Sequence, residues 1–181
     1  MVSWRKPDDG IYKINTDGSA LQESGNIGGG GIVRDHQGNL IYAFSLPFGL
    51  GTNNIAEIKA TLYGLDWCEQ HGYKSIELEV DSELLCKWIN NTVGIPWRCQ
   101  QTVQQIQDIS RKLDYFQCKH VYREANSTAD LLAKWCHNLN ILQHFYTTQQ
   151  LFGSIRESYI LDKMEIKNFR RRKTKRIKHP P

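Results

Sequence analysis

The chain has 181 residues, of which 40% are apolar, and this length and composition favour one ordinary hydrophobic core. The formal net charge of +4 is unevenly placed, because residues 167–181 carry eight Lys or Arg and no acid, whereas the other 166 residues carry 15 basic and 19 acidic side chains. Five scattered cysteines without a C-x-x-C pair argue against a disulfide framework or a zinc site and favour a reducing compartment.

Residues 11–21, IYKINTDGSAL, predict the first strand of the chain. The two-residue alternation of a strand places Lys13, Asn15 and Asp17 on one face. An aspartate in a core strand must be solvated, paired or bound to a cation, although Asp-Gly is also a common turn dipeptide. Asp17 is therefore the first candidate functional residue.

A hairpin is predicted next, in residues 28–48, GGGGIVRDHQGNLIYAFSLPF. Its turn is DHQGN, in which Gly38 can adopt a positive φ. The glycine run at residues 28–31 leaves room for another backbone or a ligand to approach closely.

Helices and strands alternate through the rest of the chain. Apolar residues at helical spacing predict a first helix in residues 55–72, with Gly72 as its stop. The later elements are a strand in 74–80, helices in 81–91 and 100–113, a strand in 115–123 and a helix in 125–139. Three consecutive strands suggest antiparallel pairing, and the two later strands suggest parallel additions. We therefore expect an α/β fold with a mixed five-stranded sheet and helices packed on it.

The domain organisation follows from these elements and from the charge. Residues 1–10 are interpreted as an N-terminal lead and residues 11–138 as the α/β domain. Residues 139–166 form a C-terminal extension, expected to be one more helix that docks on the domain or stays loose. Residues 167–181 have little to bury and are expected to be a disordered basic tail.

Four carboxylates stand out by their positions. Asp17 lies on the first strand, Glu57 in the first turn of the first helix, Asp81 directly after the fourth strand and Asp130 in the first turn of the last helix. Each has a structural alternative: a strand end for Asp17, an N-cap for Asp81, and capping boxes for the other two. Capping does not explain all four acids in this order of elements, and four clustered carboxylates would repel one another unless cations held them together. Ligands with oxygen atoms only suit Mg²⁺ or Mn²⁺ rather than Zn²⁺.

Four motifs in order resemble the type 1 ribonuclease H family, in particular the plant ribonuclease H-like domains related to retroelement reverse transcriptases. The motifs are INTDGSA, TNNIAEIKATLYGL, LEVDSELL and REANSTADLLAKW. The resemblance covers residues 4–138, and more weakly extends to residue 172. It implies a ribonuclease H-like fold and hydrolysis of the RNA strand of an RNA–DNA hybrid.

The resemblance also implies the residues of the site. The acidic quartet of the family falls on Asp17, Glu57, Asp81 and Asp130, which would be catalytic residues and the ligands of two Mg²⁺ (or Mn²⁺) ions. The backbone of two residues and the side chains of two others would lie along the minor groove of the hybrid: Gly18, Ser19, Asn53 and Asn54. The structural alternative is that the two asparagines only cap the first helix.

The sequence departs from the family in two places. Bacterial members carry a histidine-containing loop before the last helix, whereas here the stretch is short and begins at Arg123. We assign His120 to the preceding strand and give it no catalytic role. Some members bind DNA through a basic helical insertion, but the corresponding stretch here holds only Arg98. The neighbouring Trp97 could stack on a base or belong to the core.

Three functions remain open on these residues. The chain is either an active RNA–DNA hybrid nuclease, a ribonuclease H-fold module that binds nucleic acid or protein without cutting, or a retroelement fragment without a specific role. We expect a monomer without a secretory signal or a membrane span. The basic tail is either a nuclear localisation signal, a nucleic-acid contact or a solvated end, so the expected location is the nucleus and otherwise the cytoplasm.

Overall fold

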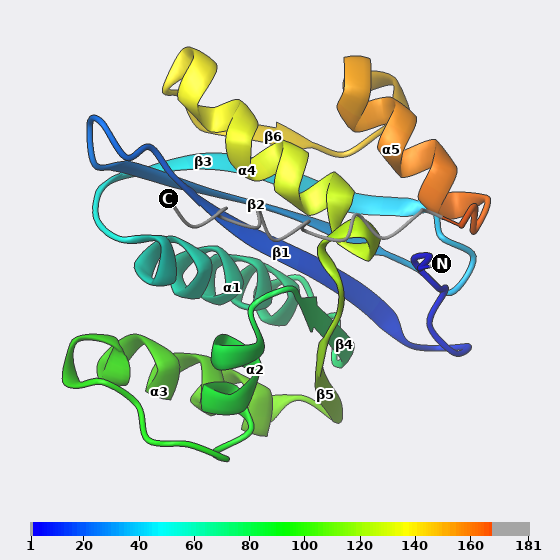
Figure 1. The fold of residues 1–181 in the computed structure, drawn as a ribbon. Helices are drawn as coiled ribbons and strands as arrows, with labels where there is room; N and C mark the ends of the chain where they lie inside the picture. Colours follow the sequence, from blue (N-terminus) through cyan, green and yellow to red (C-terminus); the bar gives the residue numbers. More distant parts are fainter. Residues whose placement is uncertain (1, 168–181) are drawn as a thin grey trace, which may run out of the picture.

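One mixed sheet forms the centre of the protein in the computed structural model, which describes residues 2–167 (Figure 1). Within these residues the sheet has six strands in the order β5-β4-β1-β2-β3-β6. The strands are β1 (Tyr12–Ala20), β2 (Asn26–Arg34), β3 (Leu40–Leu50), β4 (Ser75–Val80), β5 (Tyr115–His120) and β6 (Gln143–Phe145). As expected, β1, β2 and β3 pair antiparallel, and the later strands are parallel additions, β4 beside β1 and β5 beside β4.

The sheet lies between two layers of helices (Figure 1). The helices are α1 (Asn53–Gln70), α2 (Glu83–Ile89), α3 (Trp97–Lys112), α4 (Ser127–Leu139) and α5 (Gly153–Lys163), with short 3₁₀ helices η1 (Arg123–Ala125) and η2 (Thr148–Gln150). The first three cover one face of the sheet, and α4 and α5 cover the other (Figure 1). None of the helices in residues 2–167 combines the length and the apolar character that crossing a membrane requires.

Each face of the sheet has its own hydrophobic cluster. Under α1, α2 and α3 the buried side chains include Ile14, Phe44 and Leu65. Under α4 and α5 the cluster is smaller and includes Leu132 and Tyr159. Burial of this apolar surface on both faces stabilises the three layers.

The C-terminal extension differs from the expected single helix. Residues 143–145 form β6, which pairs antiparallel with β3 at the edge of the sheet and raises the expected five strands to six. The chain then passes through η2 into α5, which packs beside α4 (Figure 1). A three-residue strand is too short for a two-residue alternation to be recognised in the sequence. The predicted tail lies, from residue 168 onward, outside the described residues.

The glycine run of β2 accommodates the close approach of α4. A Cβ atom added to Gly30 would lie 2.3 Å from the backbone nitrogen of Ala133, and one added to Gly28 would lie 2.0 Å from the Sγ of Cys136. The expected close approach at residues 28–31 is therefore made by a second backbone, because α4 rests directly on β2.

We expect Gly30→Ala to destabilise the protein by about 1–3 kcal/mol or more, because the helix must move away from the sheet. Chemical denaturation with a two-state fit would measure the free energy of unfolding. Gly94→Ala is the matched control, since a Cβ atom there meets nothing within 4 Å. Equal stability of both variants would contradict the close packing of α4 on β2.

Candidate active site

The central strand β1 places Asp17 beside the end of β4. These strands are parallel, and Thr16 pairs with Val80, so the residues that follow are Asp17 and Asp81. Asp17 is only 5% exposed, and β1 continues past it to Ala20. The alternative in which Asp17 ends a strand is therefore wrong.

Helix α1 brings Glu57 to the same place. A Cβ atom on Gly18 would lie 2.3 Å from the backbone nitrogen of Glu57, so the missing side chain of this glycine lets α1 approach β1. The Nδ2 of Asn53 donates to the Oε1 of Glu57 at 2.8 Å. The Oε2 of Glu57 is buried and has no hydrogen-bond partner among the described residues.

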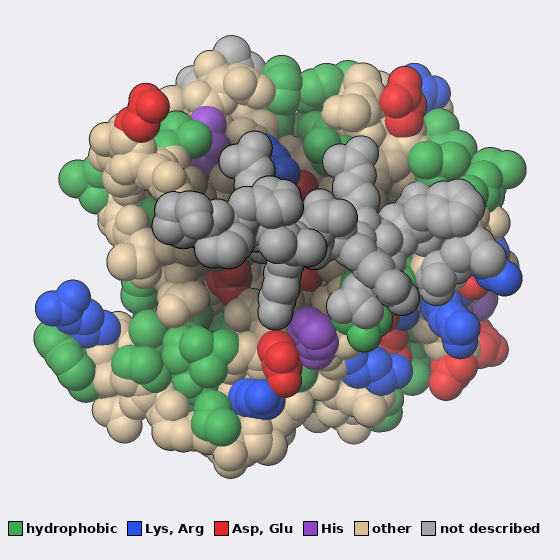
Figure 2. Space-filling model, in the orientation of Figure 1, with side chains coloured by type: hydrophobic (Ala, Val, Ile, Leu, Met, Phe, Trp, Pro, Cys, Tyr) green, Lys and Arg blue, Asp and Glu red, His purple; other side chains and the backbone are tan. Residues whose placement is uncertain are grey.

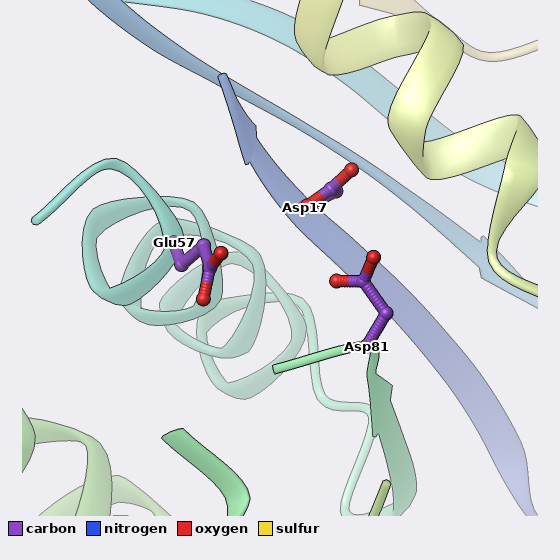
Figure 3. A group of neighbouring side chains, drawn as sticks. All are labelled: Asp17, Glu57 and Asp81. Carbon is purple, nitrogen blue, oxygen red and sulfur yellow. The ribbon is translucent and has the colours of Figure 1, made fainter. Parts of the chain in front are cut away.

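Three carboxylates from three elements thus converge (Figure 3). One oxygen from each of Asp17, Glu57 and Asp81 lies within 4.8 Å of the others. This all-oxygen arrangement is of the kind that holds a hard divalent cation. The unpartnered oxygen of Glu57 fits such an ion, because a buried carboxylate oxygen otherwise has a donor.

Asp130 joins the cluster from α4, with its charge already compensated. Its Oδ1 accepts from Nη2 of Arg123 at 2.6 Å, and its Oδ2 accepts from Nζ of Lys134 at 2.6 Å. Its proximity and negative charge also help to raise the pKa of Asp17. The structure therefore brings all four predicted acids together, with three of them facing one another and the fourth against Asp17.

The electrostatics of the four acids reflect this crowding. Burial, followed by the negative charges of its neighbours, raises the pKa of Asp17 to about 9. Burial also raises the pKa of Glu57 to about 6 and raises that of Asp81 above its ordinary value. Burial alone would raise the pKa of Asp130, but hydrogen bonds from Lys134 and Arg123 hold it below its ordinary value. A bound cation would stabilise the ionised forms of Asp17, Glu57 and Asp81.

None of the four acids serves as a helix cap. The N-cap of α1 is Thr52, and that of α2 is Ser82; each side chain accepts a backbone N–H of its own helix. The N-cap of α4 is Asn126. The capping interpretations of Glu57, Asp81 and Asp130 are therefore wrong. Glu57 also lies beyond the first turn of α1, because the helix begins two residues earlier than expected.

The residues predicted to line a minor groove lie around the acids. The backbone N–H of Gly18 donates to the Oδ1 of Asp17 at 2.9 Å, and Ser19 follows on β1. Asn53 and Asn54 occupy the exposed first turn of α1. The amide of Asn53 contacts Glu57 rather than a helix N–H, so at this residue the capping alternative is wrong.

Sequence reasoning missed three polar residues at this site. Arg123 and Lys134 hold Asp130, and Nε2 of His137 lies 3.1 Å from the Oγ of Ser19. Lys134 was recognisable, because it lies one helical turn after Asp130. Arg123 and His137 were not, because their proximity depends on how η1 and α4 pack against β1.

In the absence of divalent metal, we expect the free energy of unfolding to fall as pH rises from about 4 to 9. The folded-state pKa values of Asp17 (about 9) and Glu57 (about 6) exceed their ordinary values of 3.8 and 4.5, so the folded protein binds more protons across this window. Each excess proton contributes a slope of at most about 1.4 kcal/mol per pH unit. Denaturation in EDTA at several pH values measures this slope. Asp17→Asn should flatten it, and the exposed Glu23→Gln should not; equal slopes would contradict the raised pKa.

Known structures share this architecture. The RNase H1 of the archaeon Halobacterium salinarum superposes with a TM-score of 0.68 at 23% identity, covering 71% of this chain and 98% of that one. LC11-RNase H1, isolated from compost and solved in complex with an RNA/DNA hybrid, gives 0.63 at 27% identity, covering 68% and 94%. A protein of Arabidopsis thaliana named "Putative ribonuclease H protein" is 32% identical over 146 residues, or 81% of this chain. The present chain spans only 24% of that relative's length.

The six-stranded mixed sheet between two helical layers, with acids converging at the end of β1, defines a ribonuclease H-like domain. The chain belongs to the reverse transcriptase-like family, whose model matches residues 15–136. The resemblance seen in the four motifs is thereby confirmed.

Proposed function

We propose that this domain hydrolyses the RNA strand of RNA–DNA hybrids in a reaction that depends on a divalent metal. The observation that carries the proposal is the convergence of Asp17, Glu57 and Asp81, with Asp130 against Asp17. The likeness to LC11-RNase H1, whose structure was solved with an RNA/DNA hybrid, supports this substrate.

The four acids would hold two Mg²⁺ or Mn²⁺ ions. Bound ions of this kind lower the pKa of a water nucleophile and stabilise the leaving oxygen. The residues of this chain supply the rest. Asn53 orients Glu57, and Arg123 and Lys134 keep Asp130 ionised beside Asp17.

Substrate recognition would depend on the surface around the acids. The backbone of Gly18 and Ser19 and the amides of Asn53 and Asn54 can meet the 2′-hydroxyl groups and base edges of a minor groove, which distinguish RNA from DNA. Lys and Arg side chains of the described residues are scattered over the face in Figure 2 rather than gathered into one patch. Because the 166 residues before the basic segment carry 15 basic and 19 acidic side chains, the affinity of this part of the chain for phosphate should be modest.

The test is incubation of the purified protein with an end-labelled RNA–DNA hybrid in Mg²⁺ or Mn²⁺, beside EDTA controls and single-stranded RNA of the same sequence. We expect internal cuts in the RNA of the hybrid only, and none in EDTA. Activity that survives EDTA, or equal cutting of free RNA, would contradict the proposal. Binding of the hybrid without any cutting would support the non-catalytic module instead. Size-exclusion chromatography with light scattering would test the proposed monomer.

The basic residues 167–181 should contribute affinity rather than chemistry. They carry eight Lys or Arg, and each phosphate contact steepens the plot of log affinity against log salt by about 0.9 on duplex DNA. We expect deletion of residues 167–181 to flatten this slope and to leave single-turnover cleavage at saturating enzyme unchanged. Binding curves at several salt concentrations measure the slope. Identical slopes for both proteins would leave nuclear import as the proposed role of this segment.

A further inference from the structure

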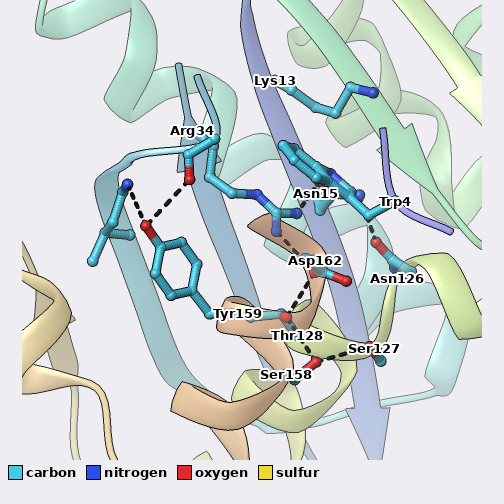
Figure 4. Close-up of polar contacts among 12 residues, drawn as sticks. Trp4, Lys13, Asn15, Arg34, Asn126, Ser127, Thr128, Ser158, Tyr159 and Asp162 are labelled. Carbon is cyan, nitrogen blue, oxygen red and sulfur yellow. Dashed lines mark hydrogen bonds and ion pairs between the residues drawn. The ribbon is translucent and has the colours of Figure 1, made fainter. Parts of the chain in front are cut away.

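Helix α5 is tied to the sheet by buried polar contacts (Figure 4). It spans Gly153–Lys163, beyond the residues 15–136 that the family model matches. Its Ile155 and Tyr159 bury apolar surface, as an ordinary packed helix would. It also buries a carboxylate, Asp162, which is only 2% exposed. A buried charge is costly, and apolar residues of similar volume usually serve stability as well, so this acid requires a specific explanation.

The partner of Asp162 is Arg34 of β2. The Nη1 of Arg34 donates to the Oδ2 of Asp162 at 2.8 Å, and the guanidinium lies 3.8 Å from the ring centroid of Trp4. The same oxygen of Asp162 accepts from the Oγ1 of Thr128, in the first turn of α4, at 2.9 Å. Asp162 therefore connects α5 to both the sheet and α4.

Asn15 of β1 accepts a hydrogen bond from Arg34. Its Oδ1 accepts from Nη2 of Arg34 at 2.7 Å and from Nε1 of Trp4 at 2.9 Å. Its Nδ2 donates to the Oε2 of Glu79 at 2.9 Å and to the Oδ1 of Asn126 at 3.0 Å. Both acceptor sites of Oδ1 and both N–H groups of Nδ2 have partners, so this fully buried amide has a single orientation.

Asn126 carries the connection to the acids. Its Nδ2 donates to the backbone oxygen of Thr16, the residue before Asp17, at 3.0 Å. Its own backbone oxygen accepts from the N–H of Asp130 at 3.0 Å. The N-terminus of α4 is thus held against β1 at the point where Asp130 meets Asp17.

We propose that Asp162 is a positioning residue for the acid site, acting through Arg34, Asn15 and Asn126. In this arrangement α5 contributes to the geometry of the acid site. It holds the first turn of α4, and with it Asp130, in register with Asp17. The positioning role concerns the geometry of the acids, and only an effect of Asp162 on cleavage would rest on the proposed function.

The first test is Asp162→Asn in the full chain. The amide keeps the shape of the side chain and an acceptor for Thr128, but removes the charge that faces Arg34. We expect the ¹⁵N–¹H resonances of Asn126 and Asp130 to shift in the metal-free protein. We also expect the affinity for Mg²⁺, measured by titration without nucleic acid, to fall by up to about tenfold, the lower end of the loss on removing a direct partner of a metal ligand, because Asp162 acts through intervening residues. Glu157→Gln, exposed on the same helix, is the matched control and should change neither.

If Asp162→Asn does not fold, a second variant tests the positioning role of Asp162. Arg34→Met combined with Asp162→Leu removes both charges together, which usually preserves stability, and cuts the connection to Asn15. The proposal predicts the same shift at Asp130 and the same fall in Mg²⁺ affinity. It is overturned if the folded double variant keeps either the wild-type resonance of Asp130 or the wild-type affinity for Mg²⁺. A wild-type protein that binds Mg²⁺ but cuts no hybrid would overturn the proposed function and leave the positioning role intact.

Discussion

Asp81→Asn should abolish hybrid cleavage while leaving the metal-free protein as stable as the wild type or more stable. Asp81 lies among the oxygens of Asp17 and Glu57, and an amide is a much poorer ligand for Mg²⁺ than a carboxylate. Removing even an outer partner of a metal ligand costs about 10–100-fold, so loss of the ligand itself should cost at least about 100-fold in rate. The fold should not suffer, because burial and the charge of Asp130 disfavour the ionised form of Asp81.

Single-turnover cleavage and thermal melts, each with and without Mg²⁺, measure both expectations. The melting temperature of the wild type should rise when Mg²⁺ is added, and that of the variant should respond much less. Glu83→Gln is the matched control, since this exposed carboxylate lies two residues further along the chain and pairs with Lys87. A large drop in the melting temperature of Asp81→Asn would instead indicate a structural role for this acid.

Asp162→Ala should lower the free energy of unfolding by about 3–5 kcal/mol, the usual cost of removing one partner of a buried ion pair. The side chains of Arg34 and Asp162 are 1% and 2% exposed, so the variant would leave a buried guanidinium without its carboxylate. The guanidinium would keep its contacts with Asn15 and Trp4 but lose its counter-charge.

Urea denaturation followed by circular dichroism measures this loss. Glu157→Ala, on the exposed side of the same helix, should stay within about 0.5 kcal/mol of the wild type. Equal stability of the two variants would show that the charge of Arg34 is compensated elsewhere.

The acids of the site were predictable from the sequence because local signals place each of them. Asp81 follows an alternating strand directly, and Asp130 lies in the first turn of a helix with an apolar stripe. The directions of strand pairing followed as well, because hairpins pair antiparallel and strands reached through helices pair parallel. The convergence of the four acids, by contrast, is not encoded by any local signal. It depends on the register of Thr16 with Val80 and on the absence of a side chain at Gly18.

What the chain order could not reveal is the buried polar core beneath α4 and α5. Taken along the sequence, Asn15, Arg34 and Asp162 have the side chains of surface residues, and alternation alone assigns Asn15 to a face without saying what covers it. Their burial is decided by segments far apart in the sequence, since 128 positions separate Arg34 from Asp162. Local patterns report which elements form, because they arise from neighbouring residues. The partners of a buried charge are chosen by packing, so only the assembled sheet, α4 and α5 determine them.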